Sequence, residues 1–253
     1  MQTVAVFNPQ SGVGKTTLCA NLGHALALAG HPLTLVDFDP AGDLSASLGL
    51  FRAPTQGIDQ VLLEQATLEA VSISTRDEVH LIPAGSRLSE WASGSISDME
   101  KGKLLGRLLS AESSETDLLL FDCPSNADLL IANILLAVDW LLIPLPGDDA
   151  GAESLPHLLQ TIETFSRARG RPLNYLFVMN RIPVRRRLTG VAASKFSALA
   201  PGHFCKSVIC QSDQLEQARQ IGRTIFESRS GSRPASDFSQ LASELVRRSL
   251  SLE

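Results

Sequence analysis

The chain has 253 residues, of which 44% are hydrophobic, and a formal net charge of −5. This length and apolar content allow one substantial core, so we expect a single domain over residues 1–253. No run of about 18 uncharged apolar residues and no signal-peptide pattern occurs, which argues against an integral membrane or secreted protein. The four cysteines form no CxxC pair, and we expect a reduced, cytoplasmic protein.

Charge is distributed unevenly along the chain. Residues 1–166 carry 7 basic and 21 acidic side chains, whereas residues 167–253 carry 15 basic and 6 acidic ones. The positive C-terminal part either faces an anionic partner or is an ordinary solvated surface. Charge alone leaves both interpretations open.

Short apolar runs alternate with longer segments of helical spacing. We predict strands at residues 3–7, 33–36, 79–82, 118–121, 140–144, 173–179 and 204–209. Helical spacing occupies residues 16–29, 128–137 and 152–168. Unbroken apolar strands separated by helices are typical of βαβ units. The chain is therefore predicted to be an α/β protein with a mostly parallel, twisted sheet of about seven strands and helices on both faces.

A segment rich in small residues joins the first predicted strand to the first predicted helix. It contains Gln10, Ser11, Gly12, Val13, Gly14, Lys15, Thr16 and Thr17. Its backbone N–H groups and the helix N-terminus can surround phosphate oxygens. Lys15 would then lie near the β- and γ-phosphates, and the Thr16 hydroxyl would reach Mg²⁺. We predict a P-loop NTPase domain that binds ATP and Mg²⁺; the alternative is a glycine turn with a solvated lysine.

Polar residues follow several predicted strands. Asp39 and Asp122 each come after an apolar strand, at the sheet edge where open α/β sheets bind ligands. One carboxylate beside Mg²⁺ and one beside the attacking water are the minimum for in-line phosphoryl transfer. Each aspartate alone would more simply be a helix N-cap or turn residue. Asp37 and Asp43 are assigned structural or peripheral roles, although Asp43 lies near enough to the site to matter. Asn180 either caps a turn or hydrogen-bonds an adenine edge.

The loop resembles the deviant Walker A motif, K-G-G-x-G-K-[ST], of the ParA/MinD family. Further matches follow in order: the V-D-x-D-P-x-G box at residues 36–42, the I-P-A-G turn at 82–85, the Walker B strand at 119–124 and the adenine-recognition strand end at 177–181. The resemblance implies a nucleotide site that includes Asn180 and Arg181, with Thr16, Asp39 and Asp122 at the metal. It also implies that Lys15 and Asp39 are the catalytic residues, with Asp39 orienting or activating the water.

The sequence departs from this family pattern at one important position. A lysine stands there in the family and reaches across an ATP-sandwich dimer to the partner's phosphates, whereas this chain has Gln10. Because glutamine carries no charge, we expect slow, partner-stimulated hydrolysis, or a substitute Lys or Arg. Some relatives that position carboxysomes also lack the lysine.

The resemblance implies a homodimeric ATPase switch that partitions or positions a cargo such as a plasmid, a chromosome region or a protein microcompartment. A ParB-like or cargo-adaptor protein would activate it. Candidate residues for nonspecific DNA binding, and hence for nucleoid association, are Arg185, Arg186, Arg187, Arg219 and Arg223. The last two are expected on one helical face at spacing i, i+4.

Two other functions remain open. One is a MinD-like, membrane-associated regulator of division, flagella or cellulose synthase. We expect the apolar stripe from residue 238 onward to be a core helix, which disfavours membrane docking. The other is a nucleotide-binding protein with little turnover, consistent with Gln10.

Overall fold

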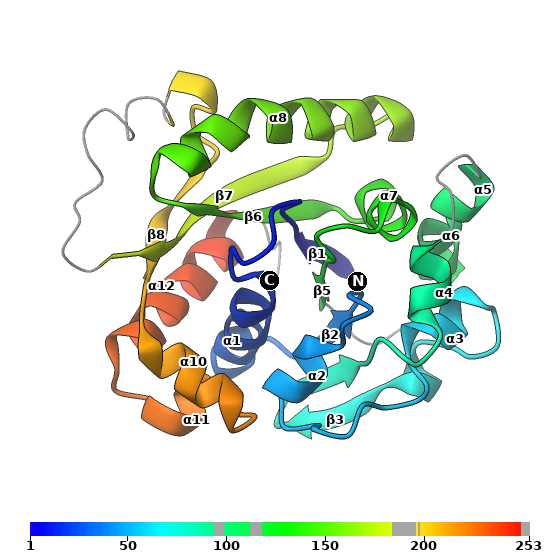
Figure 1. Ribbon diagram of the computed structural model, residues 1–253, viewed down its shortest axis with the longest axis horizontal. Helices are drawn as coiled ribbons and strands as arrows, with labels where there is room; N and C mark the ends of the chain where they lie inside the picture. The colour runs from blue at the N-terminus through cyan, green and yellow to red at the C-terminus, as the bar shows by residue number, and fades with distance from the viewer. Residues whose placement is uncertain (94–98, 112–117, 184–195, 197, 249–253) are drawn as a thin grey trace.

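The seven apolar runs of the sequence all form strands, and an eighth strand joins them in one sheet (Figure 1). The computed structural model describes residues 1–93, 99–111, 118–183, 196 and 198–248. The strands are β1 (Gln2–Val6), β2 (Leu33–Asp37), β3 (Ile73–Arg76), β4 (Val79–Ile82), β5 (Leu118–Asp122), β6 (Trp140–Pro146), β7 (Asn174–Ile182) and β8 (Phe204–Cys210).

Helices separate most of these strands along the chain. They are α1 (Lys15–Leu28), α2 (Asp43–Ser47), α3 (Ile58–Leu62), the 3-10 helix η1 (Glu69–Val71), α4 (Leu88–Ala92), α5 (Met99–Gly102), α6 (Leu104–Ala111), α7 (Asp128–Ala137), α8 (Asp149–Arg169), α10 (Asp213–Gln220), α11 (Ile225–Arg229) and α12 (Arg233–Arg248). The predicted helices at 16–29, 128–137 and 152–168 correspond to α1, α7 and α8.

The sheet has the strand order β3-β4-β2-β5-β1-β6-β7-β8, and every neighbouring pair except β3 and β4 is parallel. The mostly parallel sheet predicted from the sequence is therefore confirmed. Strand β1 is central, with β5 on one side and β6 on the other. Because parallel strands end at the same edge, the loops after β1, β2, β5, β6 and β7 all meet there.

Strand β3, at one edge of the sheet, was not predicted from the sequence. Its sequence, Ile-Ser-Thr-Arg, has one apolar residue and no unbroken hydrophobic run. It pairs antiparallel with β4, and Asp77 and Glu78 form the connection. Glu78, the second residue of this connection, has a φ of 61°, a left-handed conformation that some tight turns require at their second central position. A half-exposed edge strand lacks the pattern by which the buried strands were found.

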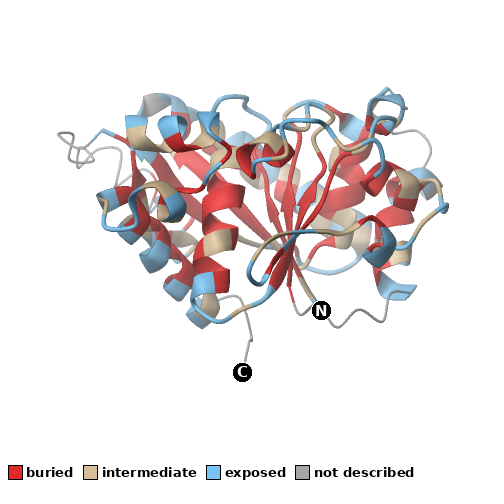
Figure 2. Cartoon of the chain, turned by 90° about the horizontal axis from the view of Figure 1, so that it is seen from below, coloured by how far each residue is buried: buried red, intermediate tan, exposed pale blue. Residues whose placement is uncertain are grey.

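Alternate side chains of the central strands enter two separate hydrophobic layers. Val4 and Val6 pack with α1 and α12 on one face. Ala5 and Phe7 belong to the layer formed with α3, α6, α7 and α8 on the other. Figure 2 shows the buried sheet between helices whose outer surfaces are exposed. The double cover explains why these strands are apolar at every position.

Helix α12 covers the open edge of the sheet at β8. The buried Glu244 carboxylate accepts hydrogen bonds from the backbone N–H groups of Lys206 and Ser207, both at 2.8 Å. Asp237 accepts from the N–H of Cys210 at 3.0 Å. These carboxylates satisfy donors that would otherwise be free on an edge strand. The predicted C-terminal core helix is thus present, and residues 249–253 lie outside the described part.

We expect Glu244→Gln to lower the free energy of unfolding by about 1–3 kcal/mol, because charge-assisted bonds to two strand N–H groups are weakened. These bonds and Arg248 hold the pKa of Glu244 below its ordinary 4.5, against the opposing effect of burial. A lowered pKa contributes stability above pH 4.5 that is lost as pH falls through the folded-state pKa. Urea unfolding at pH 7 and pH 4 measures both effects.

The exposed Glu163→Gln variant is the matched control, since Glu163 pairs with Arg167 on the surface of α8. It should change stability by less than about 1 kcal/mol. Equal losses in the two variants would contradict the role of Glu244 at the sheet edge.

Candidate nucleotide site

The segment between β1 and α1 has the backbone geometry of a phosphate-binding loop. Gly12 and Gly14 have φ values of 74° and 90°, which side-chain-bearing residues rarely adopt. The first bond within α1 runs from the N–H of Leu18 to the carbonyl of Gly14, at 2.9 Å. The N–H groups of residues 15–17 therefore precede the helical ladder and can bind an anion.

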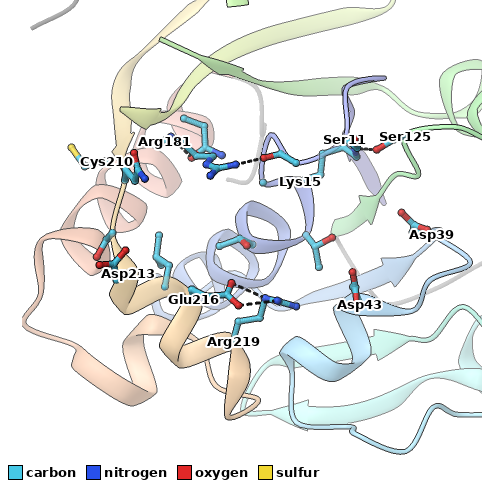
Figure 3. Close-up of a pocket in the computed structure, with 18 residues that line it drawn as sticks. Ser11, Lys15, Asp39, Asp43, Ser125, Arg181, Cys210, Asp213, Glu216 and Arg219 are labelled. Atoms are coloured by element: carbon cyan, nitrogen blue, oxygen red, sulfur yellow. Dashed lines mark hydrogen bonds and ion pairs between the residues drawn. The ribbon is translucent and has the colours of Figure 1, made fainter. Parts of the chain in front are cut away.

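Side chains from neighbouring strands hold this loop in place. Asn8 donates to the carbonyl of Pro144 in β6 at 2.8 Å and accepts from the N–H of Gln10 at 2.8 Å. Asn180 in β7 donates to the carbonyl of Val13 at 2.7 Å. The Arg181 guanidinium donates to the carbonyl of Gly12 (Figure 3). The loop is thus shaped by the protein itself.

Lys15 lies at the base of the loop. Its side chain is buried, and its Nζ donates to the Ser125 hydroxyl at 2.6 Å and to the Gln10 carbonyl at 3.4 Å. Burial lowers the pKa of Lys15, and the negative charges of Asp122 and Asp39 oppose that shift. Ser125 holds the ammonium group in position, a role that the sequence analysis missed.

Asp122 and Asp37 form a buried acidic pair on adjacent strands. They are register partners at the ends of β5 and β2, and both are essentially inaccessible to solvent. Asp37 accepts hydrogen bonds from the N–H groups of Asp39 and Ser45 at 3.3 and 3.4 Å. Within the part of the chain that the structure describes, neither carboxylate oxygen of Asp122 has a hydrogen-bond partner. Orphaned buried oxygens of this kind are what a cation site requires.

Burial shifts the titration of this pair. It raises the pKa of Asp122 to about 7, although the adjacent Thr16 hydroxyl and the Lys15 charge oppose the rise. Thr16 acts there by proximity, because its geometry falls short of an ordinary hydrogen bond. Burial also raises the pKa of Asp37 well above its ordinary 3.8, and the charge of Asp122 adds to that effect. In the absence of a bound cation the pair therefore retains protons near neutral pH.

Asp39 and Asp43 lie on the loop and helix that follow β2. Asp39 accepts from the N–H of Ala41 at 3.0 Å, a turn interaction that points the chain into α2. Both aspartates line the same cleft as Lys15 and Thr16. Asp43, assigned a peripheral role from the sequence, thus belongs to the cleft wall.

The cleft has a volume of about 600 Å³. The residues that line it are Ser11, Gly12, Gly14, Lys15, Thr16, Thr17, Asp39, Asp43, Ser125, Asn180, Arg181, Cys210, Gln211, Ser212, Asp213, Leu215, Glu216 and Arg219. Its far wall, from Cys210 to Arg219, was missed as a nucleotide-site element. The signal for it was positional: this segment follows the last strand at the same sheet edge as the P-loop.

Some predicted site residues lie elsewhere. The Gln10 side chain is exposed and does not line the cleft. Val13 does not line it either, and its carbonyl accepts the hydrogen bond from Asn180. The prediction that Arg219 and Arg223 share a helical face is wrong. Helix α10 ends at Gln220, and Gly222 (φ 66°) turns the chain so that the Arg223 N–H bonds the Ala218 carbonyl. The candidates Arg185, Arg186 and Arg187 lie outside the described residues.

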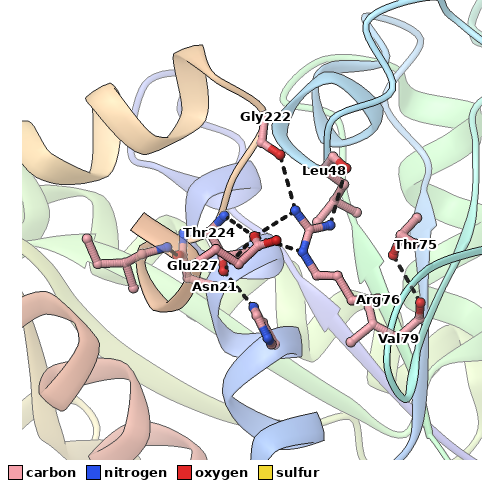
Figure 4. A network of polar contacts seen from close by, with 10 residues as sticks. Asn21, Leu48, Thr75, Arg76, Val79, Gly222, Thr224 and Glu227 are labelled. Carbon is pink, nitrogen blue, oxygen red and sulfur yellow. Dashed lines mark hydrogen bonds and ion pairs between the residues drawn. The ribbon is translucent and has the colours of Figure 1, made fainter. Parts of the chain in front are cut away.

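Arg76 of β3 ties two walls of the cleft together (Figure 4). Its guanidinium donates to the carbonyl of Leu48, just after α2, at 3.2 Å and to the carbonyl of Gly222, just after α10, at 3.1 Å. It also pairs with Glu227 at 2.8 Å, and the Arg76 side chain is only 10% exposed. Glu227 accepts from the Thr224 N–H at 2.7 Å in the capping box of α11. We call this set of contacts the Arg76 clamp.

A glycine-rich phosphate loop, a buried lysine and an unpartnered carboxylate at the carboxyl edge of a parallel sheet define a P-loop nucleotide-binding protein. A family model described as an AAA domain matches residues 1–175. The chain is 30% identical to the chromosome-partitioning ATPase Soj of Treponema pallidum over 251 residues, which cover 98% of both chains. It therefore belongs to the ParA/MinD/Soj family of P-loop ATPases.

Other known proteins share the sequence pattern or the fold. The sporulation initiation inhibitor protein Soj of Bacillus subtilis is 28% identical and covers 96% of this chain and 97% of its own. Apo McdA from Cyanothece matches with a TM-score of 0.83 at 21% identity, covering 97% of this chain and 99% of its own. A plasmid partition protein of Borrelia burgdorferi bound to AMPPNP has a TM-score of 0.79 at 18% identity and covers 97% and 98%, respectively.

We expect Asp122→Asn to stabilise the protein without nucleotide and Mg²⁺ at pH 8. The folded-state pKa of Asp122 is about 7, against an ordinary 3.8, so between these values the folded protein binds more protons than the unfolded chain. The wild-type free energy of unfolding therefore falls as pH rises through that window, by an amount on the order of several kcal/mol. Urea unfolding at pH 5 and pH 8, in EDTA, measures it.

The exposed Asp77→Asn variant should follow the wild-type dependence on pH. The expected result is that Asp122→Asn is more stable than the wild type by a larger margin at pH 8 than at pH 5. Equal margins at the two pH values would show that burial does not destabilise the charged Asp122 carboxylate.

Proposed function

We propose that this chain is an ATP-binding, dimerising switch ATPase of the ParA type. One observation carries the proposal: Lys15, which lines the cleft beside the P-loop, interacts electrostatically with the buried Asp122, whose two oxygens are unpartnered among the described residues. Lys15 and the loop would bind the phosphates, and Asp39 would orient the attacking water. We also propose that residues 1–253 act as one domain.

Thr16, Asp39 and Asp122 are the proposed residues for Mg²⁺. No cluster of three or more His, Cys, Asp or Glu side chains suited to a metal occurs within the described ranges. Mg²⁺ fits such a site because it is commonly held by one or two carboxylates together with substrate phosphates and water. When bound, it would neutralise charge on the β- and γ-phosphates. A MinD from Pyrococcus horikoshii of similar fold has been solved in complex with Mg-ADP.

We assign Asn180 and Arg181 to the nucleotide as well as to the loop. Both line the cleft. The Asn180 side chain uses one N–H for Val13 and accepts from the Arg181 N–H at 3.0 Å. An amide group has two donors and two lone pairs, so a second donor and acceptor remain for an adenine edge.

ATP-dependent dimerisation is the experiment for the switch. We would measure molar mass by light scattering with Mg²⁺ and ATP, ADP or no nucleotide, using Asp39→Ala to slow turnover. The proposal requires a monomer without nucleotide and a dimer with ATP. A mass independent of nucleotide, despite demonstrated ATP binding, would contradict it and favour a binding protein without a switch.

We expect Gln10→Lys to accelerate ATP hydrolysis by about tenfold or more, because it restores a cation that can stabilise charge in the transition state. Gln10→Ala should change the rate by less than about threefold, since the wild-type side chain is exposed and uncharged. Phosphate release by the purified protein measures both. Rapid hydrolysis by the wild type without a partner would contradict the proposed slow, partner-stimulated turnover.

We further propose nonspecific DNA as the surface on which the ATP state acts. The support is the basic C-terminal part together with the partition functions named for the relatives. Arg185, Arg186, Arg187 and Arg223 remain candidates, and Arg219 is removed from the set because it lines the cleft. The cargo is proposed to be a replicon or a microcompartment, coupled through a ParB-like or adaptor partner.

Replacing Arg185, Arg186 and Arg187 together by alanine should weaken ATP-dependent DNA binding by about tenfold or more at 100 mM salt and flatten the dependence on salt, because fewer phosphates are neutralised. Fluorescence anisotropy with random-sequence duplex DNA measures both. Arg167→Ala, on the exposed surface of α8, is the control. Equal binding by the triple variant would contradict the assignment.

Membrane docking is the less supported alternative. Phe238, Leu241 and Leu245 of α12 are buried against α1 and β8 rather than exposed. Within the described ranges, no helix is both apolar enough and long enough to traverse a bilayer. Sedimentation with anionic liposomes, with and without ATP, would detect such docking if another segment mediated it.

A further inference from the structure

Three basic side chains line the nucleotide cleft within the described residues: Lys15, Arg181 and Arg219. Two of them are engaged with the loop itself. Lys15 is buried and donates to the Gln10 carbonyl, and Arg181 donates to the Gly12 carbonyl. Arg219 is different because its side-chain hydrogen bonds, among the described residues, go to Glu216 and not to the loop. It comes from the opposite wall of the cleft, in the last turn of α10.

Arg219 is held by a bond that is easily exchanged. Its Nε and Nη2 donate to the two carboxylate oxygens of Glu216, one turn earlier, at 3.1 and 2.9 Å. The side chains of Arg219 and Glu216 are 37% and 53% exposed. An exposed ion pair within one helix contributes less than about 1 kcal/mol, whereas a bidentate contact between arginine and phosphate is among the stronger hydrogen-bonded pairs.

The position of Arg219 is set by the rest of the fold. In Figure 3 its guanidinium points across the cleft toward Asp43 at the start of α2. The Arg76 clamp bonds the chain just after each of these helices, at Leu48 and Gly222. Gly222 also approaches Gly49 closely, since a Cβ on Gly222 would lie 2.5 Å from the Gly49 Cα. The α10 wall is therefore fixed against α2, with Arg219 inside the cleft.

The net charge of the cleft lining indicates what Arg219 could bind. Four carboxylates line it, from Asp39, Asp43, Asp213 and Glu216, against the three cations. A net negative lining opposes a polyphosphate unless its cations turn toward the phosphates. Gln10 supplies no charge and does not line the cleft. Arg219 is the one lining cation within the described part of the chain whose bonds are confined to a neighbour on its own helix.

We propose that Arg219 contacts the phosphate chain of the bound nucleotide in cis, releasing Glu216 as it does so. This inference rests on the proposed function, because it presumes a nucleotide in the cleft. It assigns to α10 a positive charge that the P-loop of this chain lacks at Gln10. Glu216 is a positioning residue: its carboxylate holds the guanidinium inside the cleft until a phosphate group takes the place of that carboxylate.

The test compares binding of ATP, ADP and adenosine by calorimetry, with Mg²⁺, to the wild type, Arg219→Gln, Arg219→Lys and the control Arg167→Gln. Arg167 is also an exposed arginine paired with a glutamate on its own helix, but it does not line the cleft. We expect Arg219→Gln to weaken ATP binding by about tenfold and adenosine by less than about twofold, with part of the affinity restored in Arg219→Lys. Arg167→Gln should match the wild type.

Glu216→Gln provides an independent arm. Removing the competing carboxylate frees the guanidinium, so ATP binding should tighten by about two- to fivefold. Because Glu216→Gln also removes a negative charge from the cleft lining, the gain must disappear when Arg219→Gln is added to it, if it acts through the guanidinium. A gain that persists in the double variant would contradict the role of Arg219. An unchanged melting temperature of Arg219→Gln would show that its weaker ATP binding is a local effect.

The outcomes separate the two proposals. A wild-type protein that binds no ATP overturns the proposed function. A wild type that binds ATP, with Arg219→Gln equal to it, overturns the role of Arg219 alone. Parallel losses of ATP and adenosine would also overturn that role, because they would show a structural effect of α10 on the cleft.

Discussion

The candidate nucleotide site depends on two carboxylates placed side by side inside the sheet. Asp37 and Asp122 are register partners at the ends of β2 and β5, both out of contact with solvent. Buried like charges are costly unless they hold protons or meet a cation. The positive charge of Lys15 lies close enough to Asp122 to oppose the rise of its pKa. The two unpartnered Asp122 oxygens could in addition bind a metal cation. The strand order β2-β5-β1 brings this acidic pair to the loop that carries Lys15.

The site is prepared before any ligand binds. Asn8, Asn180 and Arg181 fix the loop from the ends of neighbouring strands, and the Arg76 clamp joins the walls formed around α2 and α10. Groups that are already oriented lose little entropy when a ligand arrives. The polar network therefore holds the loop and both walls of the cleft in one arrangement.

The sequence predicted the parts of this arrangement that have a local pattern. Unbroken apolar runs marked seven strands, and the loop before α1 marked the phosphate site. β3 was missed because an edge strand needs no continuous apolar run. Asp37 was underestimated, since only the register of β2 with β5 brings it beside Asp122. The Cys210–Arg219 wall was missed although it follows the last predicted strand at the edge that carries the P-loop. The partners of Arg76 depend on contacts over long sequence distances, and no spacing of residues encodes them. Helix α10 ends at Gln220, before Arg223, because the chain turns at Gly222, and one glycine is a weak signal in a sequence.

The central claim is that the loop around Lys15 is a working phosphate site. Binding of ATP to the wild type and to Lys15→Ala, measured by calorimetry with Mg²⁺, tests it most directly. Loss of a buried charge aimed at phosphate should weaken binding by about a hundredfold, while the wild type binds one nucleotide per chain. Equal binding by the two proteins, or none by the wild type, would contradict this account of the cleft.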